Sequence, residues 1–76
     1  MNPGQEQFFN FLMERVQEEH RNTAKEILEE NFKKQAAGTY TREDLTETQS
    51  ALMKLLRPEY VDEVGAAMAH FASQMK

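Results

Sequence analysis

The sequence predicts a small all-α protein, a bundle of three or four antiparallel helices that forms a single domain over residues 1–76. Apolar residues recur at spacings of three and four along most of the chain, which is the period of a helix. The stretches between these segments are only about two to five residues long, which is normal for neighbouring antiparallel helices. We detect no internal repeat and no domain boundary.

Composition limits what such a bundle can be. A chain of 76 residues with 39% hydrophobic content has a thin core, because a domain of this size buries only ~60% of its unfolded surface. Dimerisation could therefore complete the bundle. The chain has no Cys, so it has neither a disulfide nor a thiolate metal site.

The charge pattern bears on partners and location. A net charge of −4, with both signs interspersed, argues against nucleic acid and anionic membranes as partners. No apolar run is long enough to span a membrane, and no positive segment precedes the first apolar patch. We expect a cytoplasmic protein.

The first helix is expected over residues 3–21. Asn2 suits the N-cap and Pro3 the first helical position, and Gln5 can reach back to the cap. Phe8 and Phe11 fall off the main apolar face of this helix. Either they pack under a neighbouring segment, or they belong to a second contact surface, since large exposed aromatic residues mark interfaces.

Residues 17–23 are all polar, and two alternatives follow. Thr23 and Glu26 fit a capping box that would begin a second helix over 24–37. Alternatively, a single helix runs from residue 3 to 37. We favour a break near Asn22. In either case Gly38 ends the helix, because glycine readily adopts the left-handed conformation of a C-terminal cap.

A third helix is expected over 42–57 and a fourth over 58–75, with Thr41 as the N-cap of the third. Pro58 separates them, because proline lacks an N–H and its ring clashes with the preceding turn. The fourth segment has an apolar arc of roughly 200°, wider than that of an ordinary surface helix. We expect the other helices to be organised around it. Its arc comprises Val61, Val64, Gly65, Met68, Ala69, Phe71, Ala72 and Met75.

The titratable residues indicate no chemistry. His20 and His70 lack the Glu-x-x-His and His-Glu-x-x-His spacings of metal sites in helical proteins. The glycines are too dispersed for a phosphate-binding loop, and no nucleophile motif is present. We expect no enzyme, no metal and no cofactor.

The function predicted is therefore a non-catalytic protein–protein interaction module. It would form a homodimer through the C-terminal helix or bind another protein as a small regulator. One alternative is a small acidic inhibitor or antitoxin-like protein that docks on an enzyme or a transcription factor. A remote alternative is a metal-binding or enzymatic helical protein that uses His20 and nearby acids. The candidate interface residues are Phe8, Phe11, Gly65, Met68, Ala69, Ala72 and Met75.

Overall fold

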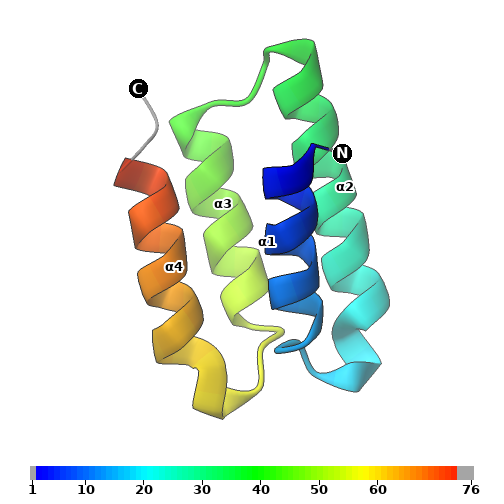
Figure 1. The fold of residues 1–76 in the computed structure, drawn as a ribbon, viewed down its shortest axis with the longest axis vertical. Helices are drawn as coiled ribbons and strands as arrows, with labels where there is room; N and C mark the ends of the chain where they lie inside the picture. The colour runs from blue at the N-terminus through cyan, green and yellow to red at the C-terminus, as the bar shows by residue number, and fades with distance from the viewer. Residues whose placement is uncertain (1, 74–76) are drawn as a thin grey trace.

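The computed structural model describes residues 2–73, without the side chains of residues 71 and 72, and this part of the chain forms a bundle of four helices (Figure 1). The helices are α1 (Pro3–Met13), α2 (Arg21–Ala37), α3 (Arg42–Met53) and α4 (Val61–Ser73). Short 3₁₀ turns, Glu18–His20 and Pro58–Tyr60, lead into α2 and α4. The all-α fold predicted from the sequence is confirmed.

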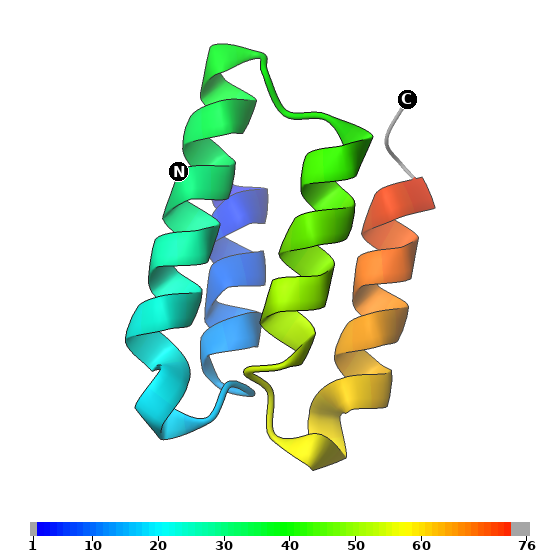
Figure 2. The ribbon, with the colours of Figure 1, turned by 180° about the vertical axis from the view of Figure 1, so that it is seen from behind.

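The helices run antiparallel and pack in chain order, α1 on α2, α2 on α3 and α3 on α4. α1 lies over the seam between α2 and α3, in front of it in Figure 1 and behind it in Figure 2, whereas α4 lies beside α3. The central pair is therefore α2 and α3. The expectation that the fourth helix organises the bundle is wrong, because α4 is an outer helix that packs chiefly on α3.

Capping boxes begin α1 and α3. Asn2 and Thr41 are the N-caps, as predicted, and the return bond to Asp44 at α3 is an addition to the prediction. The backbone N–H of Gln5 donates to Asn2 Oδ1 at 2.8 Å, and the N–H of Asn2 donates to Gln5 Oε1 at 3.1 Å. At α3, the N–H of Asp44 donates to Thr41 Oγ1 at 3.1 Å, and the N–H of Thr41 donates to Asp44 Oδ2 at 3.0 Å. Each box satisfies two backbone donors that would otherwise lack a helical partner.

The helix ends differ from the prediction, and one backbone contact explains why. α1 ends at Met13 rather than near residue 21, and α3 ends at Met53 rather than 57. After each end the chain extends, and Val16 forms an isolated antiparallel bridge with Leu56. The N–H of residue 17 donates to the carbonyl of residue 55 at 2.9 Å, and that of residue 57 to the carbonyl of residue 15 at 3.0 Å. The chain therefore turns at both places, and a single helix over 3–37 is excluded.

The predicted start of the second helix is also wrong. α2 begins at Arg21, with His20 at the N-cap and no side-chain cap, and Thr23 is an exposed residue of the first turn. The bridge and the following 3₁₀ turn fix this start, so the Thr23 capping box is not needed. The predicted change of direction at Pro58 is confirmed, since Pro58 opens the 3₁₀ turn before α4.

The core reveals a structural repeat that the sequence analysis did not detect. Both halves of the chain follow one pattern: a capped helix, an extended residue in the bridge, a 3₁₀ turn and a second helix. The main buried cluster consists of residue pairs 40 positions apart, namely Leu12 and Leu52, Val16 and Leu56, Ala24 and Val64, and Leu28 and Met68. The two hairpins thus contribute equivalent side chains to one core.

Gly38 and Gly4 allow a matched test of backbone conformation. Gly38 caps α2 with φ 74°, and a Cβ there would meet nothing within 4 Å. Gly38→Ala should therefore lower the free energy of unfolding by about 1–2 kcal/mol through the left-handed conformation alone. Gly4 is helical, so Gly4→Ala should raise it by about 0.5–1 kcal/mol. Urea denaturation of both variants measures the two changes in the free energy of unfolding. Equal changes in the two variants would contradict the assignment of a left-handed conformation to Gly38 alone.

Candidate functional site

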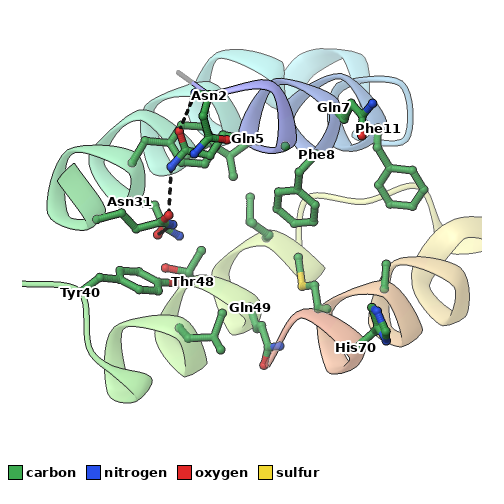
Figure 3. Close-up of a pocket in the computed structure, with 18 residues that line it drawn as sticks. Asn2, Gln5, Gln7, Phe8, Phe11, Asn31, Tyr40, Thr48, Gln49 and His70 are labelled. Carbon is green, nitrogen blue, oxygen red and sulfur yellow. Dashed lines mark hydrogen bonds between the residues drawn. The ribbon is translucent and has the colours of Figure 1, made fainter. Parts of the chain in front are cut away.

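A groove of about 560 Å³ opens between α1 and α4, with α2 and α3 as its floor (Figure 3). It exists because the two outer helices pack on the central pair instead of on each other. Its apolar lining comes from all four helices and consists of Phe8, Phe11, Leu28, Phe32, Leu45, Leu52, Ala67 and Met68. The groove is thus an opening into the core of the bundle.

The remaining lining is polar. Charged residues make up 29% of the chain, yet none of the Lys, Arg, Asp and Glu residues within 2–73 lines the groove. A charged group that entered it would lose its hydration without gaining a counter-charge, which is costly. The groove therefore suits neutral groups. Besides Gly4, the residues concerned are Asn2, Gln5, Gln7, Asn31, Gln35, Tyr40, Thr48, Gln49 and His70.

Side-chain amides form a hydrogen-bonded chain at one end of the groove. Gln5 Nε2 donates to Gln35 Oε1 at 2.9 Å, and Gln35 Nε2 donates to Asn31 Oδ1 at 3.2 Å (Figure 3). These bonds join α1 to α2. Asn31 is only 7% exposed and occupies the same buried stripe as Ala24 and Leu28. The sequence analysis missed it, although a polar residue three positions after Leu28 on an apolar stripe is a usable signal.

The Tyr40 side chain enters the same end of the groove from the turn between α2 and α3, beside Asn31 and Thr48 (Figure 3). Its hydroxyl is buried and has no hydrogen-bond partner within residues 2–73. A buried hydroxyl that has lost water without gaining a partner destabilises the fold by roughly 1–3 kcal/mol. Such groups are rare in native proteins and call for an explanation.

At the other end, Arg15 links the turn after α1 to α4. Its guanidinium binds Glu63 through Nη2, 3.0 Å from Oε1, and donates from Nη1 to the carbonyl of Phe11 at 2.9 Å. Its central carbon also lies 4.0 Å from the centre of the Phe11 ring and 5.5 Å from that of Tyr60, within the range of cation–π contacts. Arg15 therefore holds Phe11, a wall residue of the groove, in place.

Three of the seven predicted interface residues line this groove. Phe8 and Phe11 are half-buried on its α1 wall, and Met68 is buried at the base of its α4 wall. The sequence signal for the phenylalanines was their departure from the main apolar face. Nothing local to the sequence indicated that they would face α4.

The small residues of α4 lie elsewhere. A Cβ on Gly65 would be 3.5 Å from Met53 Cε, so Gly65 faces α3 within the same chain. Ala69 is exposed, and both residues line a shallower hollow of about 470 Å³ between α3 and α4. The side chain of Ala72 and all of Met75 lie outside the described residues.

The histidines are far apart. His20 is half-buried in the turn before α2, and His70 is exposed near the end of α4, at the opposite end of the bundle (Figure 1). His70 lines the groove, which the sequence analysis did not predict. Over residues 2–73, no cluster of three His, Asp or Glu side chains could hold a metal ion.

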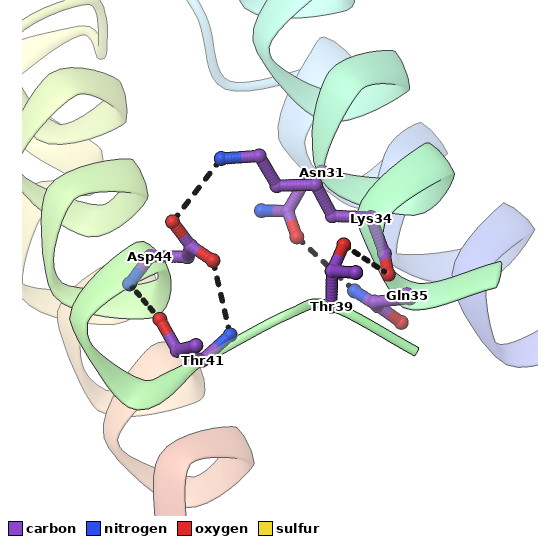
Figure 4. Close-up of polar contacts among 6 residues, drawn as sticks. All are labelled: Asn31, Lys34, Gln35, Thr39, Thr41 and Asp44. Carbon is purple, nitrogen blue, oxygen red and sulfur yellow. Dashed lines mark hydrogen bonds and ion pairs between the residues drawn. The ribbon is translucent and has the colours of Figure 1, made fainter. Parts of the chain in front are cut away.

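An ion pair supports the turn that carries Tyr40. Lys34 Nζ on α2 lies 3.1 Å from Asp44 Oδ1 on α3, and the same carboxylate accepts the N–H of Thr41 (Figure 4). That backbone hydrogen bond is the main cause, and Lys34 the next, of a lowered pKa for the Asp44 carboxyl. The hydrogen bond from Lys34 to Asp44 in turn raises the pKa of the lysine.

Comparisons with protein-family models, with curated proteins and with solved structures found no match for this chain. In the part of the chain that the structure describes, no helix combines the length and the apolar character needed to cross a membrane.

The Asp44 contacts predict an acid-sensitive contribution to stability. Because the pKa of Asp44 is lower in the folded protein, its stabilising effect is present at neutral pH. It is lost as the pH falls below the usual range of an Asp carboxyl towards the folded-state pKa. Unfolding free energies measured from neutral to acidic pH should fall less steeply for Asp44→Asn than for wild type. Glu43→Gln, an exposed neighbour, is the control; a D44N curve parallel to wild type would contradict the assignment.

Removal of the Tyr40 hydroxyl is expected to stabilise the protein. Tyr40→Phe deletes the unpaired buried hydroxyl and keeps the ring, so the free energy of unfolding should rise by roughly 1 kcal/mol. Tyr60→Phe is the matched control, because Tyr60 lies beside Arg15 and does not line the groove. Thermal and urea unfolding measure both. A loss of stability in Tyr40→Phe would show that the hydroxyl is paired in solution.

Proposed function

We propose that this protein is a non-catalytic interaction module that receives an amphipathic helix of a partner protein in the groove between α1 and α4. The observation that carries the proposal is the lining, which combines an apolar floor with polar but uncharged surroundings. Binding of a partner helix through its apolar face is a recurrent mode of protein recognition. An enzyme or a transcription factor could supply the helix, in which case the protein would act as its inhibitor.

The walls are suited to a helix. Phe8 and Phe11, three residues apart, lie on one side of α1, and both point towards α4 (Figure 3). Opposite them α4 contributes Ala67, whose small side chain leaves space between the walls. Met68, at the base of the α4 wall, is flexible and polarizable, and methionine adapts its shape to different apolar partners.

A second copy of the chain is a poorer occupant than another protein. Among the side chains of α4 that the structure describes, the exposed apolar ones are Ala66 and Ala69, whose methyl groups would fill little of the groove. Contacts across an unfilled space contribute no dispersion energy. The partner helix therefore carries larger apolar side chains. The α3–α4 hollow beside Gly65 and Ala69 remains the place where a homodimer would form.

A pair of adjacent substitutions tests the proposal. Ala67→Trp places an indole in the groove, whereas Ala66→Trp places one on the exposed surface of the same helix. A phage-displayed library of helical peptides, randomised on one face, is selected against each folded variant. Wild type and Ala66→Trp should enrich peptides with large apolar residues one helical turn apart, and Ala67→Trp should lose them.

Recovery of the same peptides by Ala67→Trp would contradict the proposal. Sedimentation of the three proteins provides the second measurement. A wild-type dimer that Ala67→Trp converts to monomer would identify a second copy as the occupant instead.

A further inference from the structure

We propose that the partner helix carries, beside its apolar residues, one uncharged side chain with an oxygen acceptor, and that Tyr40 and Asn31 bind it. This inference rests on the proposed function and specifies the chemistry of the occupant. Asn, Gln, Ser and Thr are the smaller residues with such a side chain. The polar end of the groove then determines which helices bind and in which register.

The Tyr40 hydroxyl is the first observation. It is buried at the groove end and lacks a partner within residues 2–73, so the free protein is less stable than it would be with phenylalanine there. An occupant that accepts its hydrogen removes this cost only when bound. The groove should therefore bind a helix with an acceptor more tightly than a wholly apolar helix, because the apolar helix would leave the Tyr40 hydroxyl unpaired.

Asn31 supplies a second, adjacent donor. Its Oδ1 accepts a hydrogen bond from Gln35, and its Nδ2 donates to no group in the described part of the chain. Asn31 and Tyr40 lie together at the same end of the groove (Figure 3). Two neighbouring donors match one carbonyl oxygen, which has two lone pairs.

The amide chain fixes this arrangement before the partner arrives. Gln5 holds Gln35 from α1, and Gln35 holds the oxygen of Asn31, which orients the Asn31 nitrogen. A donor held in position loses little conformational freedom on binding. The network also disfavours charged side chains: a lysine or arginine would face the donors of Tyr40 and Asn31, and a buried carboxylate would find no Lys or Arg among the described residues that line the groove.

Selection of the same helical-peptide library on wild type, Tyr40→Phe and the control Tyr60→Phe tests the inference. Wild type and Tyr60→Phe should enrich Asn, Gln, Ser or Thr at one position beside the apolar residues, and Tyr40→Phe should enrich them clearly less. The most enriched wild-type peptide is then synthesised with its polar residue, with Leu and with Glu at that position. Fluorescence anisotropy measures the three dissociation constants.

Wild type should bind the polar peptide at least about tenfold more tightly than the Leu peptide, because the Leu peptide forfeits the hydrogen bonds from Tyr40 and Asn31. Tyr40→Phe should show a clearly smaller preference for the polar peptide, because only the Asn31 donor remains, and both proteins should bind the Glu peptide most weakly. Peptides that are enriched but wholly apolar, or a preference unchanged in Tyr40→Phe, would overturn this inference and leave the proposed function standing. Enrichment of no peptide by wild type would overturn both.

Discussion

Two backbone hydrogen bonds beside Val16 and Leu56 join the two helical hairpins, and the rest of the bundle depends on them. An extended residue cannot belong to a helix, so the bridge ends α1 and α3 and turns the chain before α2 and α4. It also places Val16 and Leu56 in the core, where both are buried. The pairing is short, but it sets the relative position of the two hairpins, and with it the spacing of the outer helices.

Comparison of the two halves of the internal repeat distinguishes residues that the core requires from residues that line the groove. The eight positions of the main buried cluster are apolar in both halves, because both hairpins fill the same interior. The groove positions do not match: Phe8 corresponds to Thr48 and Phe11 to Ala51. Had the second half kept phenylalanines there, they would have lain near the floor on α3 rather than on a wall. The two halves therefore differ at the positions that give the groove its apolar α1 wall.

Local signals in the sequence were sufficient for the helix caps and for most of the core. Asn2, Thr41 and Gly38 act through residues at most a few positions away, so their roles were predictable. The end of α1 was not predictable, because the backbone of residues 15 and 17 bonds to that of residues 57 and 55, and nothing local in the sequence reveals these distant partners.

The groove depends on packing between helices distant in sequence. Phe8 and Phe11 were singled out as off-face residues, but their position opposite α4 follows from the separation of the two outer helices. The seam of small residues on α4 was predicted from spacing alone. The spacing could not show that Gly65 already contacts Met53 of the same chain.

The position of α1 and α4 at the outside of the bundle has a dynamic consequence. Each has one main helical neighbour, whereas α2 and α3 each have two. Elements with fewer packed neighbours open at lower free energy, so we expect the amide protons of α1 and α4 to exchange with solvent sooner than those of α2 and α3. The walls of the groove are thus the parts of the protein that can adjust most easily, on a floor that stays rigid. Local opening of one wall would admit an occupant without unfolding the central pair.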